Sequence, residues 1–218
     1  GKPINPNDIE IDIDNNIWLT TTQNNWGHYG GKIFKSLDGI DFNLVHDFQA
    51  GAGRTELEPS QSDSNKFWVL INQWNQANLY VTEDGFNTVT QITSEPNDVD
   101  VGIPADDFCR QQAFYNLVIE ANENDHLFVG GINLFKSSTQ GVSWEQLSHW
   151  YGGYERQNVH PDQHTIVFRP GEGNENQVVF GNDGGIYYCD NIQNPYTSIQ
   201  ISERNKGYNT AQFYCGSI

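Results

Sequence analysis

The sequence predicts an all-β fold built from repeated four-stranded sheets, and three observations lead to this prediction. The 218 residues include 6 Trp, 10 Tyr, 12 Phe and 21 Gly but no Met, a composition typical of short strands joined by tight turns. No long stretch repeats apolar residues at the i, i+3, i+4 and i+7 spacing of an amphipathic helix. Four segments instead share one pattern of four short apolar runs.

The repeat has a period of about fifty residues. Equivalent positions of the second apolar run are Trp18, Trp68, Phe128 and Val179, at intervals of 50, 60 and 51 residues. Four strands in a unit of roughly 40–50 residues are typical of a β-propeller blade. We therefore predict a β-propeller of four-stranded antiparallel blades. The expected blades cover residues 1–53, 54–112, 113–158 and 159–208, and 209–218 is the expected first strand of a next blade.

The strands within each blade are apolar runs between Gly, Pro, Asn and Asp. One interval is longer because residues 94–112 form an acidic, Pro-containing insertion, which is typical of a loop. A single blade cannot bury both faces of its sheet, and four blades are at the lower limit for a ring. We therefore expect an incomplete part of a larger propeller, with the remaining blades of the same protein as partners. The expected strands are 9–12, 15–20, 30–36, 42–45, 55–59, 67–71, 78–82, 88–92, 117–122, 126–130, 133–137, 144–147, 165–170, 177–181, 185–189 and 197–201.

The turn between the third and fourth strands carries a recurring motif in three blades. A short Asp or Thr side chain accepts hydrogen bonds from N–H groups of the turn, and a Gly supplies a positive φ. The motif resembles the Asp-box, Ser/Thr-x-Asp-x-Gly-x-Thr-Trp, although the first copy is one residue short and the third has Thr in place of Asp. We interpret its residues as structural: Ser36, Asp38, Gly39, Thr82, Asp84, Gly85, Ser137, Thr139, Gly141 and Trp144.

Further motifs in the second half extend this resemblance. They are Phe-Tyr-Asn-Leu-Val-Ile-Glu-Ala-Asn at 114–122, the segment 129–137, Val-His-Pro-Asp-Gln-His at 159–164, Gly-Asn-Asp-Gly-Gly-Ile-Tyr at 181–187, and 209–214. Together they resemble secreted Bacteroidetes proteins with BNR/Asp-box repeat propellers, of the sialidase-like and sortilin-like superfamily. The resemblance implies type IX secretion and a secreted or cell-surface location.

The charge of the chain excludes some partners. The formal net charge is −17 at pH 7, which opposes binding to nucleic acid or to an anionic membrane surface. No run of 18 apolar residues is present, so we expect no membrane span. The three cysteines, Cys109, Cys189 and Cys215, are too few for a disulfide scaffold. A bridge between Cys189 and Cys215 is conceivable in an exported protein.

His160, Asp162 and His164 form the most suggestive constellation. In an extended segment, residues i, i+2 and i+4 project to one side, and this segment precedes an innermost strand at the channel mouth. The three side chains could hold a divalent metal or form an acid–base pair, or they could order the channel rim, which we favour. Asp183 could face the same axis, so that Asp162 and Asp183 flank a glycosidic bond. More often, Asn-Asp-Gly-Gly is a hairpin turn.

Aromatic residues and acidic loops supply the remaining candidates. Trp150 and Tyr154, with Trp26 and Trp74, could stack on sugars or fill blade interfaces, and Tyr115 is a further candidate binding residue. The acidic loops 5–14 and 98–107 are candidates for calcium, with a solvated loop as the default reading. No other cofactor or metal is expected.

The sequence favours a non-catalytic module that binds glycan or protein at the propeller face. The first alternative is a glycoside hydrolase with Asp162 and Asp183 as catalytic carboxylates, and the second is a scaffold part of a large surface assembly. A sialidase needs three arginines around its substrate carboxylate, and this chain has five Arg in all, none in a matching motif. The sequence decides neither the ligand nor the oligomeric state.

Overall fold

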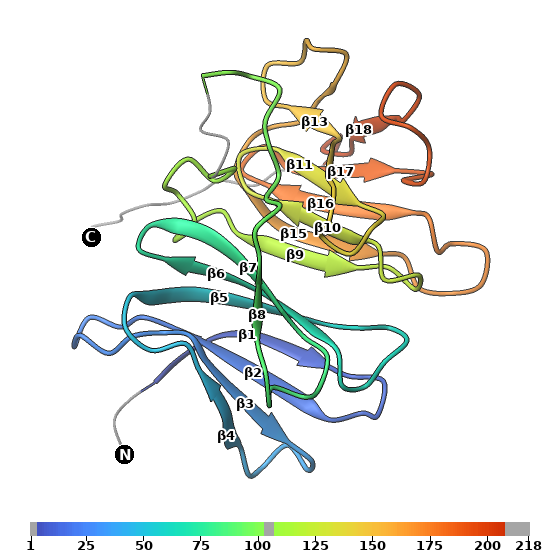
Figure 1. Ribbon diagram of the computed structural model, residues 1–218. Helices are drawn as coiled ribbons and strands as arrows, with labels where there is room; N and C mark the ends of the chain where they lie inside the picture. Colours follow the sequence, from blue (N-terminus) through green and yellow to red (C-terminus); the bar gives the residue numbers. More distant parts are fainter. Residues whose placement is uncertain (1–3, 103–106, 208–218) are drawn as a thin grey trace, which may run out of the picture.

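The computed structural model describes residues 4–102 and 107–207. It confirms the predicted all-β fold, because it contains four antiparallel sheets of four strands in a propeller arrangement (Figure 1). The described residues form no helix that is long and apolar enough to cross a membrane. Residues 209–218, including Cys215, lie outside the described ranges, so the expected next strand and the Cys189–Cys215 bridge stay predictions.

Each blade is a meander in which neighbouring strands follow one another along the chain. Blade 1 is β1 (Asn5–Ile11), β2 (Ile17–Thr22), β3 (Lys32–Ser36) and β4 (Asn43–Asp47). Blade 2 is β5 (Ala52–Pro59), β6 (Phe67–Gln73), β7 (Gln76–Thr82) and β8 (Thr90–Ile92). Blade 3 is β9 (Val118–Ala121), β10 (Leu127–Gly130), β11 (Leu134–Ser137) and β12 (Glu145–Gln146). Blade 4 is β15 (Gln163–Phe168), β16 (Val178–Asn182), β17 (Gly185–Cys189) and β18 (Ile201–Glu203).

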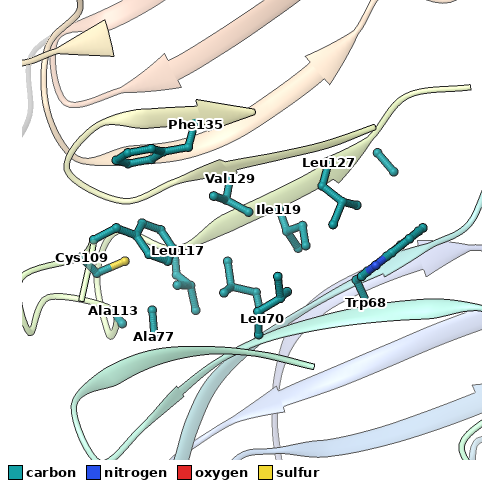
Figure 2. Packing of buried hydrophobic residues seen from close by; sticks show 13 residues of the cluster. Trp68, Leu70, Ala77, Cys109, Ala113, Leu117, Ile119, Leu127, Val129 and Phe135 are labelled. Atoms are coloured by element: carbon teal, nitrogen blue, oxygen red, sulfur yellow. The ribbon is translucent and has the colours of Figure 1, made fainter. Parts of the chain in front are cut away.

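The first strand of each blade is innermost, and these strands pack against one another in succession: β1 on β5, β5 on β9, and β9 on β15. Apolar side chains from facing sheets fill the space between successive blades in three clusters. Figure 2 shows the middle cluster, where Trp68 and Leu70 of blade 2 pack against Ile119, Leu127 and Val129 of blade 3. Burial of these faces drives the blades together.

The antiparallel meander gives the propeller two different faces. We call the loop face the end formed by the segments that precede each innermost strand and by the turns between second and third strands. We call the turn face the opposite end, which carries the turns between first and second strands and between third and fourth strands. All candidate binding residues of the sequence lie at the loop face, and the Asp-box-like motifs lie at the turn face.

The structure corrects four expectations. Most of residues 5–14, an expected acidic loop, form strand β1. β18 begins at Ile201, because Ser198 and Ile199 donate backbone hydrogen bonds to the carbonyl oxygen of Pro195 and form a turn. A short parallel pair, β13 (Ser148–His149) with β14 (Gln157–Asn158), connects blades 3 and 4. The acidic insertion is partly buried rather than solvated.

The insertion packs on blade 3 through several hydrogen bonds, two of which are accepted by one buried carboxylate. Asp98 is buried and accepts hydrogen bonds from Asn133 Nδ2 at 2.6 Å and Gln146 Nε2 at 3.1 Å. The amide donors offset the cost of removing this charge from water, which composition alone does not reveal.

Candidate functional site

Tyr115, His164 and Asp183 meet at the loop face. The Tyr115 hydroxyl donates to the Asp183 carboxylate, with distances of 2.9 and 3.1 Å to its two oxygens. His164 Nε2 lies 2.8 Å from Asp183 Oδ1, and the Tyr115 and His164 rings meet edge to face at 4.9 Å. The three side chains come from the segment before β9, from β15 and from the β16–β17 turn. We call them the Tyr–His–Asp cluster.

The structure does not bring His160, Asp162 and His164 together. Asp162 has φ of +65°, so the backbone turns there instead of running extended, and alternate side chains do not share one side. Asp162 accepts a hydrogen bond from Asn116 Nδ2 at 2.6 Å. His160 is exposed, and its Nδ1 lies 3.1 Å from the carbonyl oxygen of Pro161. The carboxylate of Asp183 is engaged by Tyr115 and His164, and no contact joins it to Asp162.

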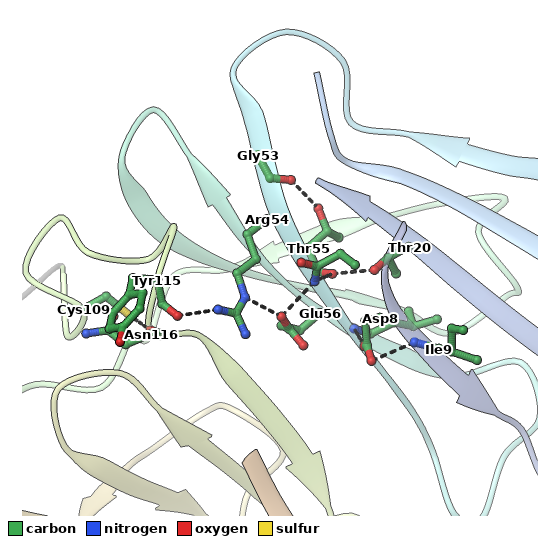
Figure 3. Close-up of polar contacts among 12 residues, drawn as sticks. Asp8, Ile9, Thr20, Gly53, Arg54, Thr55, Glu56, Cys109, Tyr115 and Asn116 are labelled. Atoms are coloured by element: carbon green, nitrogen blue, oxygen red, sulfur yellow. Dashed lines mark hydrogen bonds and ion pairs between the residues drawn. The ribbon is translucent and has the colours of Figure 1, made fainter. Parts of the chain in front are cut away.

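Arg54 connects the cluster to the centre of the propeller (Figure 3). Its guanidinium donates to the carbonyl oxygen of Tyr115 and, through Nε, to Glu56 Oε1 at 2.7 Å. Asn7 Nδ2 also donates to Glu56 Oε1, at 2.9 Å. Burial, together with the Glu56 charge, raises the pKa of Asp8 to about 6. The hydrogen bonds from Tyr115 through Arg54 to Glu56 and Asn7 therefore link the Tyr–His–Asp cluster to the innermost strands β5 and β1.

Three blades carry a glutamate at the same position of the innermost strand. Each glutamate pairs in register with the aromatic residue of the second strand: Glu10 with Trp18, Glu58 with Trp68, and Glu120 with Phe128. Blade 4 has Val167, paired with Val179, at this position. We call Glu10, Glu58 and Glu120 the axial glutamates. Sequence reasoning missed them, although an apolar residue followed by Glu recurs at 9–10, 57–58 and 119–120.

The axial glutamates hold protons more tightly than an ordinary carboxyl. Burial raises the pKa of Glu10 to about 8, and the charges of Asp8 and Glu56 add to the shift. Burial also raises the pKa of Glu120 to about 8, with Glu10 and Asp8 adding to it. The pKa of fully buried Glu58 lies well above its usual range because of burial and because of Glu120 and Glu10. Each of these shifts favours the neutral carboxyl over the carboxylate.

Exposed aromatic rings gather at the loop face. Trp26, Trp74 and Tyr151 are 74, 71 and 76% exposed, and Phe114 and Tyr154 are also exposed. Trp150, by contrast, is half-buried against Arg110, whose guanidinium carbon lies 5.3 Å from the ring centroid. The exposed rings make the loop face the most aromatic part of the described surface.

Trp74 has a backbone conformation that is unfavourable for a residue with a large side chain. It forms the two-residue β6–β7 turn with Asn75, and φ is +55° at Trp74 and +66° at Asn75. Such turns favour Asn and Gly, because a larger side chain at positive φ costs about 1 kcal/mol or more. Phe86 also has a positive φ, of +72°, but its ring is buried in the core, whereas the Trp74 ring is exposed. A strained backbone together with an exposed ring makes Trp74 a candidate functional position.

Two cavities adjoin these features. One, of about 380 Å³, opens at the loop face of blade 1, and its lining includes His28, Tyr29, Lys32 and Asp47. The other, of about 370 Å³, opens at the turn face between blades 3 and 4, where Glu120 contributes to the lining. That second lining further includes Gln61, Glu123, Phe168, Arg169 and Glu172.

The Asp-box-like turns direct their polar side chains at their own backbone. Asp38 Oδ1 accepts from the N–H groups of Ile40 and Asp41, both at 2.9 Å. Asp84 Oδ1 accepts from Thr88 N at 2.8 Å. In the third turn, Thr139 Oγ1 accepts from Ser143 N at 2.9 Å. These hydrogen bonds lower the pKa of Asp38 and Asp84 and leave the side chains occupied within the turns.

The two segments that were candidates for calcium use Asp12 and Asp98 as hydrogen-bond acceptors within the protein, and the partners of Asp98 lie in blade 3. Asp12 accepts from Trp18 Nε1 and Asn16 Nδ2, both at 2.8 Å. Within residues 4–102 and 107–207, no group of three or more His, Cys, Asp or Glu side chains is placed to hold a metal ion.

Comparison with known proteins shows the fold and no more. No protein-family model matches the sequence, and no curated protein does. A GH74 enzyme from Niastella koreensis superposes with a TM-score of 0.58 at 15% identity, over 92% of this chain and 30% of that one. The GH74 xyloglucanase from Xanthomonas campestris gives a TM-score of 0.53 at 14% identity, over 85% and 27%. A protein of unknown function from Dyadobacter fermentans gives 0.52 at 12% identity, over 90% and 63%.

The chain therefore spans less than a third of the length of these two GH74 enzymes. Identities of 12–15% support a shared architecture, whereas activity depends on the residues of a site.

Proposed function

We propose that this chain is a non-catalytic binding module that holds a neutral glycan on its loop face. The observation that carries the proposal is the exposure of the Trp74 ring in a turn whose positive φ is unfavourable for a large side chain. Flat aromatic faces stack on the apolar faces of sugar rings while leaving the hydroxyl groups free. Trp26 lies at the same face on the β2–β3 loop, beside the cavity of about 380 Å³.

Polar groups at the same face supply the hydrogen bonds that a glycan needs. The cavity beside Trp26 offers the Lys32 and Asp47 side chains, whose charged groups lie 3.3 Å apart. The Tyr–His–Asp cluster adds hydroxyl and imidazole groups in fixed positions. The net charge of −17 disfavours an anionic polysaccharide, so a neutral glycan is the expected ligand.

The Tyr–His–Asp cluster supports binding over hydrolysis. Asp183 accepts from Tyr115 and contacts His164, and Asp162 accepts from Asn116, so the two carboxylates have separate partners. A hydrolase would need two carboxyl groups on opposite sides of one glycosidic bond.

Affinity electrophoresis against a panel of soluble neutral polysaccharides, including xyloglucan, mannan and β-glucan, tests the proposal. We expect at least one polysaccharide to retard the chain, and we expect Trp26→Ala to weaken the retardation about tenfold, a change of about 1.4 kcal/mol. Val142→Ala is the matched control, because Val142 is also an exposed apolar residue but lies at the turn face. Equal retardation of both variants, or none by any glycan, would contradict the proposal.

The second candidate function is glycoside hydrolysis, and one observation favours it. Glu120 has a pKa of about 8 and contributes to the turn-face cavity, where the side chains of Glu123 and Glu172 are nearby acidic groups. Glu175 lines the same cavity and has a lowered pKa, and two carboxyls whose pKa values are shifted in opposite directions are typical of an acid–base pair. Release of reducing sugar from the same panel, abolished by Glu120→Gln or by Asp162→Asn in a folded chain, would favour the hydrolase over the binding module.

The resemblance to secreted BNR/Asp-box propellers extends the proposal to location. We propose export by the type IX route and a secreted or cell-surface location. A role as a scaffold within a large surface assembly is compatible with the same location. Detection of the protein in culture medium or on intact cells by antibody tests this part, and an exclusively intracellular signal would contradict it.

A further inference from the structure

The Trp74 ring rests on the backbone of Gly51, which directly precedes the innermost strand of blade 2. A Cβ on Gly51 would lie within 2.7 Å of three atoms of the Trp74 ring, and two of these, Cδ2 and Cε2, are shared by the two rings of the indole. Gly51 therefore covers a face of the indole rather than its edge. Because Trp74 is still 71% exposed, its other face is open to a ligand.

This arrangement requires glycine at position 51. Gly51 has φ of +85°, a conformation that glycine adopts without the steric cost that a Cβ brings. Trp74 N also donates to the Gly51 carbonyl oxygen, at 3.2 Å, so one residue holds both the backbone and the ring of Trp74. With a larger residue at this position, the indole would have to move away from the segment that supports it.

Trp26 lies at the equivalent place in the neighbouring blade, because both tryptophans belong to the connection between the second and third strands. Trp26 is part of a turn in which Asn24 Oδ1 accepts from the N–H groups of Trp26, at 3.0 Å, and His28, at 3.1 Å. The equivalent connections of blades 3 and 4, at 131–133 and 183–184, contain no aromatic residue. The pair of rings is therefore not a structural feature that every blade repeats.

Backbone contacts hold the two tryptophan connections in a fixed relation. Gly30, at the base of the connection that carries Trp26, donates its N–H to the carbonyl oxygen of Ala52 at 2.8 Å. A Cβ on Gly30 would overlap the carbonyl oxygen of Gly53, so the two segments approach as closely as their backbones allow. Residues 51–53 therefore contact both connections and fix the position of one relative to the other.

We propose that Trp26 and Trp74 bind an internal stretch of one extended glycan chain, which crosses the loop face from blade 1 to blade 2, with Gly51 as the positioning residue for the second ring. This inference rests on the proposed function and adds the kind of glycan, a chain long enough to reach both rings. Sheets packed face to face lie about 10 Å apart, a separation that an extended oligosaccharide can bridge. Rings as exposed as these do not enclose a single sugar, so affinity has to come from two contacts on one chain.

The dependence of affinity on ligand length tests the proposal. The probes are oligosaccharides from partial hydrolysates of xyloglucan, mannan and β-glucan, separated from disaccharide to decasaccharide, and isothermal titration measures their binding. We expect a step in affinity, of about tenfold or more, at the length that first reaches both rings. The step should be absent in Trp26→Ala and in Trp74→Ala, and each variant should keep the weak binding of the shorter oligosaccharides.

Gly51→Ala tests the positioning role, because it keeps the Trp74 ring but displaces it. We expect loss of the step and faster oxidation of Trp74 by hydroxyl radicals, since the covered face of the ring becomes exposed. Gly51→Asn should have the same effects with less strain, because Asn tolerates a positive φ.

Gly173→Ala is the matched control at the turn face. Gly173 has φ of +83°, and no described atom outside its chain neighbours lies within 4 Å of the position of a Cβ there. The change introduces a similar backbone strain without moving a ring, so the step and the oxidation of Trp74 should stay as in the unmodified chain. Thermal unfolding confirms that each variant is folded.

The outcomes distinguish this inference from the proposed function. Retardation by a polysaccharide, combined with equal affinity for short and long oligosaccharides, would overturn the inference alone. A step that persists in folded Trp74→Ala would overturn it too, and a step that persists in both folded Gly51 variants would refute the positioning role. No retardation by any polysaccharide would remove the proposed function and this inference with it.

Discussion

The loop face and the turn face of this propeller use the same kinds of residue in opposite ways. At the turn face, Asp38 and Asp84 accept hydrogen bonds from their own turns, and Trp68, near that end of β6, is completely buried. At the loop face, Trp74 at the other end of β6 is exposed in a disfavoured conformation. The comparison teaches that the contacts of a side chain, and not its residue type, indicate whether its role is structural or functional. Changes near the turn face should alter stability, and changes at the loop face should alter binding.

The largest expected effect is loss of stability in Trp68→Ala. Trp68 is buried between blades 2 and 3, so truncation leaves a cavity and should lower the free energy of unfolding by about 3–5 kcal/mol. Urea denaturation measures this change. Trp26→Ala serves as the exposed counterpart and should stay within about 0.5 kcal/mol of the unmodified chain. A comparable loss in both variants would break the contrast between packed and exposed tryptophans.

The second effect is a dependence of stability on pH that the axial glutamates cause. The pKa of Glu120 rises from 4.5 to about 8 on folding, so its contribution to stability is fully present below pH 4.5 and is lost as the pH rises through about 8. The free energy of unfolding should fall by on the order of 1–3 kcal/mol between about pH 5 and pH 8.

Glu120→Gln should make this profile shallower, because the amide does not titrate whereas Glu10 and Glu58 still do. Urea denaturation at a series of pH values measures both chains. Glu175→Gln is a control, since backbone hydrogen bonds from Glu175 and Gly173 lower the pKa of this carboxyl instead of raising it. An unchanged slope in Glu120→Gln would show that this carboxyl does not contribute to the profile.

The third prediction is that one substitution, at Trp74, raises stability while it weakens binding. Trp74→Gly relieves the positive φ of the β6–β7 turn and should raise the free energy of unfolding by about 1 kcal/mol. The same change removes the exposed ring and should weaken glycan retardation. Thermal unfolding and affinity electrophoresis on the same samples measure both quantities. A destabilised variant with intact binding would reverse the assignment of Trp74 to function.

The smallest effect concerns the Tyr–His–Asp cluster. Tyr115→Phe removes the hydroxyl that donates to Asp183 but keeps the ring against His164. We expect a loss of stability below about 1 kcal/mol and a few-fold weaker binding by isothermal titration. Tyr188→Phe removes a comparable hydroxyl on blade 4, which donates to Asp190, and should leave binding unchanged.

The architecture follows from local patterns, and so the sequence predicts it. Four short apolar runs recur at a nearly constant interval, and each blade is a meander whose strands pair with their neighbours in the chain. Boundaries were less certain where a turn replaces a strand, as at residues 197–200 before β18. The burial of Asp98 also escaped prediction, because it depends on amides 35 and 48 residues away.

The candidate site could be predicted only in part. Its residues were recognised by type, but the pairing of Tyr115 with Asp183 joins positions 68 residues apart. The positive φ of Asp162, which separates it from His164, has no signal in the sequence, because Asp adopts both extended and left-handed conformations. The axial glutamates did leave a signal, a repeated apolar–Glu pair, but their closeness to one another depends on how β1, β5 and β9 pack together.

Hydroxyl-radical footprinting with and without the retarding glycan tests most directly whether the loop face binds ligand. Aromatic side chains react strongly when exposed, so Trp26, Trp74 and Tyr151 should be labelled in the free chain and protected by the glycan. Leu37, Ile40 and Val142, exposed at the turn face, should react equally in both states. Protection of the turn-face residues, with the loop-face rings unchanged, would contradict the assignment of binding to the loop face.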